Sequence, residues 1–315
     1  MRSAFLFPGQ GSQSVGMADS IFNTYAIAQE TLNEADQALD EKLSGLIQNG
    51  PAETLKETAN AQPAILTVSV AIGRVLQEKG LQAVVMAGHS LGEYSALVLS
   101  GALGFPDAVR LVRLRGRFMQ EAVPLGEGTM SAILGAEDAL VEEVCSEITR
   151  SGDLVEPANY NCPGQLVISG TVLGVAKAVE ELKKRGAKRC IPLEVSAPFH
   201  SSLLKPAAEK LRPELEKVIW NDPRTPYVAN VDCATVTSKN QIIQRLTDQI
   251  WKPVRWTQTL QKIFNEWKPD RSIEVGPGQV VSGHVKKINM LIQRITSDSL
   301  ESVELLQSIK LNQFP

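Results

Sequence analysis

The residues best suited to chemistry lie in a Gly-x-Ser-x-Gly motif, Gly88-His89-Ser90-Leu91-Gly92. An apolar segment precedes the motif and a helix-forming segment follows it, which is the strand-turn-helix context that the motif requires. The two glycines permit a sharp turn without a Cβ clash, and such a turn exposes a serine hydroxyl at the end of a sheet. We therefore predict that Ser90 is a covalent nucleophile, although a serine that only caps the next helix gives the same local pattern.

A serine nucleophile needs a nearby base, and the chain has three histidines. His89 adjoins Ser90, but neighbouring side chains on such a turn diverge, so we expect His89 to be structural. His200 ends the segment Ala197-Pro198-Phe199-His200, where the chain returns from a predicted insertion. A loop at a domain junction is a favoured place for a pocket. His200 is therefore the preferred base.

His284 offers a second arrangement. The order Ser, Asp, His along the chain is that of α/β hydrolases, and His284 with Asp232 or Asp270 satisfies it. Lys286 and Lys287 follow this histidine in a late helix, so a role at the surface or at the helix end is the better interpretation. The serine motif by itself is compatible with either histidine.

Four arginines, Arg110, Arg113, Arg115 and Arg117, lie in a helix predicted around residues 106–121. Their spacing distributes charge around the helix, and most are expected at a solvated surface with their stems over apolar neighbours. An arginine that points toward the serine would instead bind a carboxylate through two parallel hydrogen bonds.

The elements that must position these residues alternate between strand and helix. One helix is predicted over 63–76, with Pro63 in its first turn. Two more helices are predicted, one directly after Ser90 and one over 106–121. Strands are predicted over 3–7, 83–87, 226–231 and 271–275. This alternation predicts a parallel α/β sheet. The loop after the first strand lacks the third glycine of a dinucleotide motif and the Lys-Ser/Thr of a phosphate loop, so neither site is predicted there.

The pattern changes between residues 128 and 195. Strands are predicted at 129–134, 154–159, 165–170 and 188–195, and helices over 137–149 and through Val175, Val179 and Leu182. The order β-α-β-β-α-β is that of a ferredoxin-like unit. Its second and fourth strands lie at sheet edges, and these strands contain Pro157 and Pro192. We predict a core of residues 1–127 and 196–315 with an inserted subdomain of residues 128–195.

Composition limits the classes of partner. The 315 residues carry a net charge of −3, so neither nucleic acid nor an anionic membrane is an expected partner. The four cysteines contain no Cys-x-x-Cys pair, so no zinc site or disulfide framework is predicted and a reducing cytoplasm fits best. The apolar run at residues 4–7 is too short for a signal peptide, and no apolar stretch is long enough to span a bilayer.

Seven motifs in collinear order resemble the malonyl-CoA:acyl carrier protein transacylases. They are Phe7-Pro-Gly-Gln10-Gly-Ser, Gln62-Pro63, Gly88-His-Ser90-Leu-Gly-Glu-Tyr-Ser, Arg115-Gly-Arg-Phe-Met-Gln, Asn159-Tyr-Asn161-Cys-Pro-Gly-Gln, Ala197-Pro-Phe-His200 and Gln249-x-x-x-Pro-Val-x-Trp256. The likeness covers essentially the whole chain. It implies the same fold class as above: an α/β hydrolase-like core with a ferredoxin-like insertion.

The resemblance also implies roles for individual residues. Ser90 would be the nucleophile and His200 its base, held by a main-chain carbonyl near Gln249 instead of an acid, so that the pKa of His200 is expected near ~6.5. The main-chain N–H groups of Gln10 and Leu91 would form the oxyanion hole. Substrate-binding roles fall to Arg115, for the malonyl carboxylate, and to Gln62, Phe199, Asn159, Asn161, Lys188 and Arg189. Phe199 would crowd an α-methyl group, and Cys162 is expected to be a buried, inert thiol.

The implied reaction is ping-pong transfer of malonyl from malonyl-CoA to the phosphopantetheine thiol of acyl carrier protein. No cofactor or metal is expected, and the protein is expected to be a cytoplasmic monomer. The alternatives are a serine thioesterase, an acyltransferase of polyketide synthesis, and an inactive carrier-protein binding module. The basic run from Lys183 to Arg189 is the candidate docking surface. The resemblance implies that Lys188 and Arg189 lie beside the CoA-binding cleft.

Overall fold

Short apolar segments pair side by side to form the main sheet of the computed structural model, which describes residues 1–195 and 197–311. The strand order is β10-β9-β1-β2-β7-β8. All neighbours are parallel except β8, which is antiparallel to β7. The strands are β1 (Ser3–Phe7), β2 (Ala83–Gly88), β7 (Tyr227–Val228), β8 (Thr235–Val236), β9 (Arg271–Glu274) and β10 (Gln293–Thr296).

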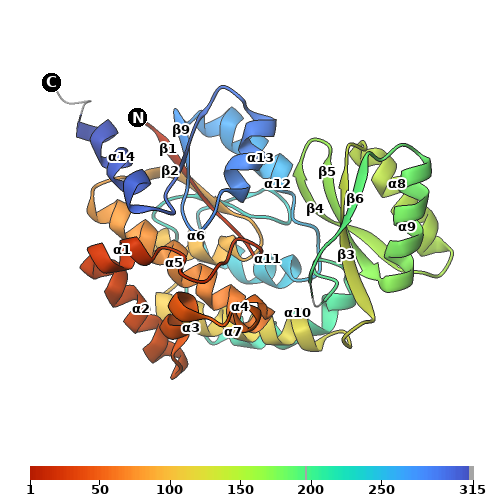
Figure 1. Ribbon diagram of the computed structural model, residues 1–315, viewed down its shortest axis with the longest axis horizontal. Helices are drawn as coiled ribbons and strands as arrows, with labels where there is room; N and C mark the ends of the chain where they lie inside the picture. The colour runs from red at the N-terminus through yellow and green to blue at the C-terminus, as the bar shows by residue number, and fades with distance from the viewer. Residues whose placement is uncertain (196, 312–315) are drawn as a thin grey trace.

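Both faces of this sheet are covered by helices (Figure 1). Alternate residues of β1 enter different clusters: Phe5 and Phe7 pack on one face, whereas Ala4 and Leu6 pack on the other. The first face packs against α1 (Asp19–Thr24), α2 (Ala26–Leu39), α3 (Leu43–Asn49), α4 (Ala52–Lys56), α5 (Thr58–Glu78), α6 (Gly92–Leu99), α7 (Phe105–Glu121), η1 (Ser202–Leu204), α10 (Lys205–Glu216), α11 (Ile242–Gln249) and α14 (Leu300–Leu311). The second packs against α12 (Trp256–Lys262), the π-helical turn η3 (Ile263–Trp267) and α13 (Val280–Ile288). Burial on both faces explains why the central strands β1 and β2 are almost continuously apolar.

A separate antiparallel sheet lies at the other end of the molecule (Figure 1), in the order β4-β5-β3-β6. Two helices pack on its outer face around their own apolar cluster. The elements are β3 (Gly128–Leu134), α8 (Asp138–Arg150), β4 (Val155–Cys162), β5 (Gln165–Thr171), α9 (Val172–Lys184) and β6 (Arg189–Pro192). Pro157 and Pro192 lie in the edge strands β4 and β6, as predicted for the second and fourth strands of a ferredoxin-like unit.

The small sheet also contacts the core. Met130, Ala132 and Val167, on its inner face, belong to the main apolar cluster. The β4 backbone bonds to a core segment, because Val254 N donates to Ala158 O at 2.8 Å and Tyr160 N donates to Val254 O at 2.9 Å. The domain boundaries at 127/128 and 195/196 stay predictions, and Ser196, which begins the second core segment, lies outside the described residues.

Several details differ from the sequence prediction. The last strand predicted for the insertion, 188–195, spans only Arg189–Pro192. Helix α5 begins at Thr58, so Pro63 lies inside it and not in its first turn. The strand predicted at 226–231 is shorter, because the chain turns back after Val228 to pair as β8. Strand β10 was not predicted, since only Ile295 of its four residues is buried. None of the described helices is long and apolar enough to cross a membrane.

Candidate active site

Ser90 lies on a sharp turn between β2 and α6. Its φ is 50°, in the left-handed region that non-glycine residues rarely adopt. A Cβ at Gly88 would lie 1.8 Å from the Gly92 carbonyl carbon, and a Cβ at Gly92 would lie 2.3 Å from Phe7 O. Glycine is therefore required on both sides of the serine, and the backbone is that of a nucleophile elbow.

His200 contacts the serine directly. Its Nε2 lies 2.8 Å from Ser90 Oγ, and its Nδ1 lies 2.7 Å from Gln249 O. Because a carbonyl oxygen only accepts, Nδ1 carries the proton, and Nε2 is left as the acceptor for the serine hydroxyl. The geometry is therefore that of a general base oriented by a main-chain carbonyl in place of a carboxylate.

The predicted pKa of His200 is wrong. Burial of the ring, followed by the positive charge of Arg115, lowers the pKa of His200 to about 3. The bond to Gln249 O acts in the opposite direction but is the weaker effect. The family resemblance implied that no carboxylate holds this ring, but the sequence did not show that the ring is only 4% exposed and lies beside a cation.

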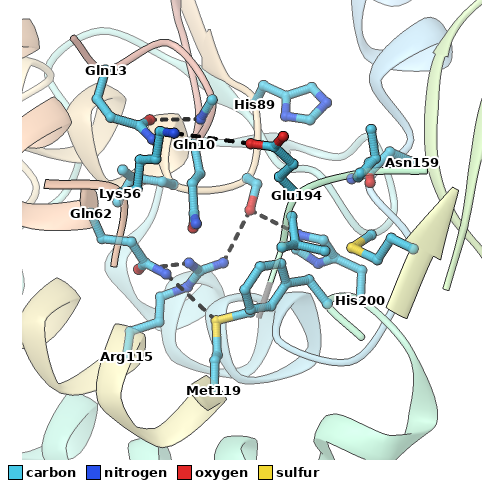
Figure 2. A pocket seen from close by; sticks show the side chains of 17 residues that line it. Gln10, Gln13, Lys56, Gln62, His89, Arg115, Met119, Asn159, Glu194 and His200 are labelled. Atoms are coloured by element: carbon cyan, nitrogen blue, oxygen red, sulfur yellow. Dashed lines mark hydrogen bonds and ion pairs between the residues drawn. The ribbon is translucent and has the colours of Figure 1, made fainter. Parts of the chain in front are cut away.

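Arg115 points from α7 toward the same hydroxyl (Figure 2). Its Nη2 donates to Ser90 Oγ at 3.1 Å and to Gln249 Oε1 at 2.9 Å, and its Nη1 donates to Gln62 Oε1 at 2.8 Å. The residue is 1% exposed and has no carboxylate within 4.0 Å among the described residues. A guanidinium in this position is available to a substrate carboxylate.

The four arginines of α7 thus divide into three kinds. The side chains of Arg110 and Arg117 are 53% and 52% exposed, as the spacing predicted. Arg113 is buried and pairs with Glu41 at 2.7 Å, a structural role. Only Arg115 turns toward the serine.

A cavity of about 410 Å³ opens above the serine. The residues that line it come from both units: Gln10, Gly11, Gln13, Lys56, Gln62, His89, Ser90, Leu91, Arg115, Met119, Met130, Asn159, Leu193, Glu194, Val195, Phe199 and His200. Figure 2 shows Arg115 and His200 at the cavity, and each of them contacts Ser90 Oγ. Lys56 and Glu194 face each other at 4.0 Å between the core and the chain leaving β6.

The predicted oxyanion-hole residues both line this cavity. Among the residues that the structure describes, we find no protein acceptor for the main-chain N–H of Gln10 or of Leu91. Two such donors beside a nucleophile suit the oxygen of a tetrahedral intermediate. The Gln10 side chain donates to Thr58 Oγ1 at 3.2 Å, which fixes the loop after β1.

Asn161 does not line the cavity, although Asn159 does. Its Oδ1 lies 2.8 Å from His89 Nε2, behind the serine turn. The His89 ring is packed edge-on against Trp256, with centroids 5.5 Å apart. Burial lowers the pKa of His89. Asn161 and His89 therefore form a structural pair, of which only His89 lines the cavity.

The arrangement based on His284 is wrong, and so is its expected place at the surface. His284 is 7% exposed, and its ring centroid lies 6.1 Å from that of His89. Burial lowers the pKa of His284 to about 3. Asp232 pairs with Arg245 at 2.8 Å, and Asp270 accepts from Arg2 N at 2.6 Å. Neither aspartate can therefore act as the acid of a triad with this histidine.

Three further predicted residues lie away from the cavity lining. Lys188 and Arg189 are exposed at the start of β6, the end remote from Leu193 and the cavity. Cys162 is 4% exposed, and burial raises the pKa of its thiol, so it is a poor nucleophile. No cluster of three metal-ligating side chains occurs in the described part of the chain.

Sequence reasoning missed Asn230 and the role of Glu93. Asn230 Oδ1 accepts from Ser90 N at 2.7 Å, and its Nδ2 donates to Gly88 O at 2.7 Å. Glu93 Oε2 accepts from Gln249 Nε2 at 2.8 Å. The signal was present: Asn230 is a polar residue just beyond a strand, at the sheet end where α/β proteins bind ligands, and Glu93 is a charge among apolar neighbours.

Comparison with known proteins gives a consistent assignment. The acyl transferase domain model matches residues 4–305. The malonyl CoA-acyl carrier protein transacylase of Bacillus subtilis (strain 168) is 49% identical over 308 residues, covering 98% of this chain and 97% of that protein. The structure of an acyl carrier protein S-malonyltransferase from Vibrio cholerae matches with a TM-score of 0.94 and 42% identity, covering 97% and 100% of the two chains. A malonyl-transacylase in complex with a type II PKS acyl-carrier protein matches with a TM-score of 0.95 and 42% identity, covering 98% and 100%. The chain belongs to the malonyl CoA-acyl carrier protein transacylase family.

Proposed function

We propose that this enzyme transfers the malonyl group of malonyl-CoA to the phosphopantetheine thiol of acyl carrier protein. One observation carries the proposal. Ser90 Oγ lies between His200 Nε2, at 2.8 Å, and Arg115 Nη2, at 3.1 Å. A base and a carboxylate-binding cation therefore meet at one nucleophile, which suits an acyl group that carries its own carboxylate.

In the first half-reaction His200 Nε2 takes the proton of Ser90 Oγ while Oγ attacks the thioester carbonyl carbon. The N–H groups of Gln10 and Leu91 stabilise the oxyanion. Collapse of the tetrahedral intermediate breaks the C–S bond, and the leaving thiolate of CoA takes the proton from His200. The product of this step is malonyl-Ser90.

The second half-reaction reverses these roles. The phosphopantetheine thiol gives its proton to His200, and its sulfur attacks the malonyl ester. The C–O bond to Ser90 then breaks, and Oγ recovers the proton from His200. Every proton passes through one imidazole, so the reaction proposed needs no metal or organic cofactor.

Recognition of the acyl group follows from the position of Arg115. In malonyl a single methylene separates the carbonyl carbon from the carboxylate. An acyl group on Oγ can therefore turn its carboxylate back toward a guanidinium about 3 Å from the same oxygen. Phe199, 7% exposed in the cavity wall, would crowd a substituent on that methylene.

The test is intact-mass analysis after mixing the protein with malonyl-CoA, followed by addition of carrier protein. We expect one malonyl adduct on the enzyme, which then moves to the carrier protein. Release of free malonate at the rate of CoA release, with no transfer to a thiol, would establish the thioesterase alternative. An adduct that never forms would support the binding module.

Two pathways use this transfer, fatty acid synthesis and polyketide synthesis. A similar structure contains a type II PKS acyl-carrier protein. Competition between a fatty acid and a polyketide carrier protein for malonyl-Ser90 separates the two roles. We also propose that Lys188 and Arg189 attract the acidic carrier protein. The cytoplasmic location and the monomeric state stay predictions. Size-exclusion chromatography with light scattering tests the monomeric state.

A further inference from the structure

A buried carboxylate lies beneath the cavity without touching it. Glu93, in the first turn of α6, is fully buried and does not line the cavity. Its Oε2 accepts from Gln249 Nε2 at 2.8 Å and from Asn230 N at 3.2 Å, whereas its Oε1 has no partner among the described residues. No lysine or arginine of the described chain pairs with it within 4.0 Å. Burying a carboxylate without a cation is unfavourable, so its presence requires an explanation.

The first consequence concerns the side-chain amide of Gln249. Glu93 Oε2 and Ser90 O both accept from its Nε2, at 2.8 and 2.9 Å. Neither oxygen can face the amide oxygen of Gln249, because both groups only accept. The amide is therefore held in one orientation, and its Oε1 must face Arg115 Nη2, at 2.9 Å.

The second consequence concerns the serine turn. Glu93 also accepts from the main chain of Asn230, whose side chain bonds Ser90 N and Gly88 O on either side of the turn. The same carboxylate oxygen is therefore linked through Asn230 to the strained serine turn, and through the amide of Gln249 to the guanidinium of Arg115. Hydrogen bonds link these groups without a break, and the residues that connect them, Glu93, Asn230 and Gln249, are fully buried.

We propose that Glu93 is a positioning residue that fixes Arg115 through the amide of Gln249, and thereby sets the preference for acyl groups that carry a carboxylate. The proposal rests on the proposed function. Glu93 acts because its side chain is long enough to place an acceptor oxygen, Oε2, at hydrogen-bond distance from Gln249 Nε2 and Asn230 N. Its net charge is secondary, because Oε2 accepts from two hydrogen-bond donors while no cation of the described chain pairs with the carboxylate.

Three substitutions at Glu93 distinguish the effect of side-chain length from the effect of charge. Glu93→Gln keeps an acceptor oxygen at the same distance without the charge; its second polar atom replaces Oε1, which has no partner in any case. Glu93→Asp keeps the charge but withdraws the oxygen by one methylene. Glu93→Met fills a similar volume without an acceptor. The measurement is the single-turnover rate of Ser90 acylation from malonyl-CoA and from acetyl-CoA, for protein shown to be folded by circular dichroism.

We expect Glu93→Gln to keep the malonyl/acetyl ratio within about threefold of the wild type. Glu93→Asp and Glu93→Met should lower it at least tenfold, mostly by slowing the malonyl reaction. The matched control is Glu274→Gln, since Glu274 is also a buried carboxylate, but it accepts from Val281 N and Ser282 N at the start of α13. This control should lower the melting temperature and leave the ratio unchanged.

Equal losses on both substrates in Glu93→Asp would overturn the proposal and make Glu93 merely structural. Retention of the ratio in Glu93→Asp with its loss in Glu93→Gln would also overturn it, in favour of an effect of charge. If Glu93→Met fails to fold, the comparison of Gln with Asp still decides. Failure of the proposed function is distinguishable, because the wild type itself would then show no malonyl preference.

Discussion

Arg115 Nη2 lies 3.1 Å from Ser90 Oγ, so the cation proposed to bind the acyl carboxylate also contacts the nucleophile. The same Nη2 donates to Gln249 Oε1. A carboxylate that enters the cavity must therefore share or replace contacts that the protein already makes. This relationship makes the choice of acyl group and the reactivity of the serine properties of one local arrangement.

Arg115→Ala should remove most malonyl transfer. Truncating one partner of a buried charge pair costs about 2 to 5 kcal/mol, or roughly 30- to 3,000-fold in rate. Acetyl-CoA brings no carboxylate, so transfer of acetyl should gain relative to malonyl. Steady-state kinetics with both substrates gives the ratio.

Arg113→Ala is the matched control for Arg115→Ala, because Arg113 is buried in the same helix but pairs with Glu41. It should lower stability and leave the ratio of substrates unchanged. Losses of the same size on malonyl and acetyl in Arg115→Ala would show that Arg115 is structural.

Ser90→Ala should abolish the malonyl adduct, because the acyl group then has no oxygen to bond. Intact-mass analysis should show one malonyl unit on the wild type and none on the variant. Peptide mapping is the accompanying check, and an adduct on Cys162 would contradict the assignment.

Acylation should not fail as the pH falls through 6.5. The pKa of His200 is lowered to about 3, so the folded enzyme keeps a neutral base well below the ordinary pKa of histidine. Single-turnover acylation measured from pH 8 to 5 should change less than about threefold. A tenfold loss per pH unit below 6.5 would restore the original expectation of an unperturbed base.

His284→Leu should alter the pH dependence of stability. The folded-state pKa of His284 is about 3 and the unfolded value is ~6.5, so below pH 6.5 the unfolded chain binds the additional proton. Stability from this neutral ring is therefore full above pH 6.5 and is lost as the pH falls toward 3. At pH 5 the loss is about 2 kcal/mol relative to pH 7.5.

Urea unfolding of the wild type and of His284→Leu at pH 7.5 and pH 5 measures this difference. The gap in unfolding free energy between the two proteins should shift by about 2 kcal/mol in favour of the variant at the lower pH. Malonyl transfer at pH 7.5 should remain nearly unchanged, since no described bond joins His284 to Ser90 or His200. A gap that does not change with pH would mean that the buried ring titrates normally.

Lys188→Glu combined with Arg189→Glu should raise KM for carrier protein at low salt and leave acylation of Ser90 by malonyl-CoA at saturation intact. The effect should shrink between about 0.05 and 0.5 M salt, where screening of exposed charges becomes strong. Lys217→Glu combined with Lys239→Glu makes the same charge change at two exposed lysines of the core segment that follows the small sheet in the chain. Equal effects of the two pairs would place the docking surface elsewhere.

The sequence predicted the fold because its periodic patterns are strong. A strand whose residues are all buried, such as β1, is typical of the interior of a parallel sheet. A proline in a strand, such as Pro157 or Pro192, is typical of a sheet edge. Strand β10 escaped prediction because an edge strand with a single buried residue has no such pattern. Pro63 misled because a proline inside a helix and one in its first turn look alike in the sequence.

For the site, the motifs pointed to Ser90, His200 and Arg115, which the structure brings together. The sequence could not show burial. His284 was expected at the surface because Lys286 and Lys287 follow it, yet both lysines are exposed while His284 is only 7% exposed in the same helix. The lowered pKa of His200 has the same origin, since it depends first on burial of the ring and then on Arg115, which is remote in sequence.

The inserted unit cannot be exchanged as an independent module. Its exit segment supplies Leu193 and Glu194 to the cavity and leads within a few residues to the base His200. Its strand β4 is bonded to Val254, five residues after Gln249, which holds that base. The two attachment points therefore flank the His200 to Gln249 hydrogen bond from both sides. Any rotation of the small sheet relative to the core would therefore change the geometry of this hydrogen bond. Replacing the small sheet with another unit that alters either attachment would change the orientation of His200 as well as the shape of the cavity.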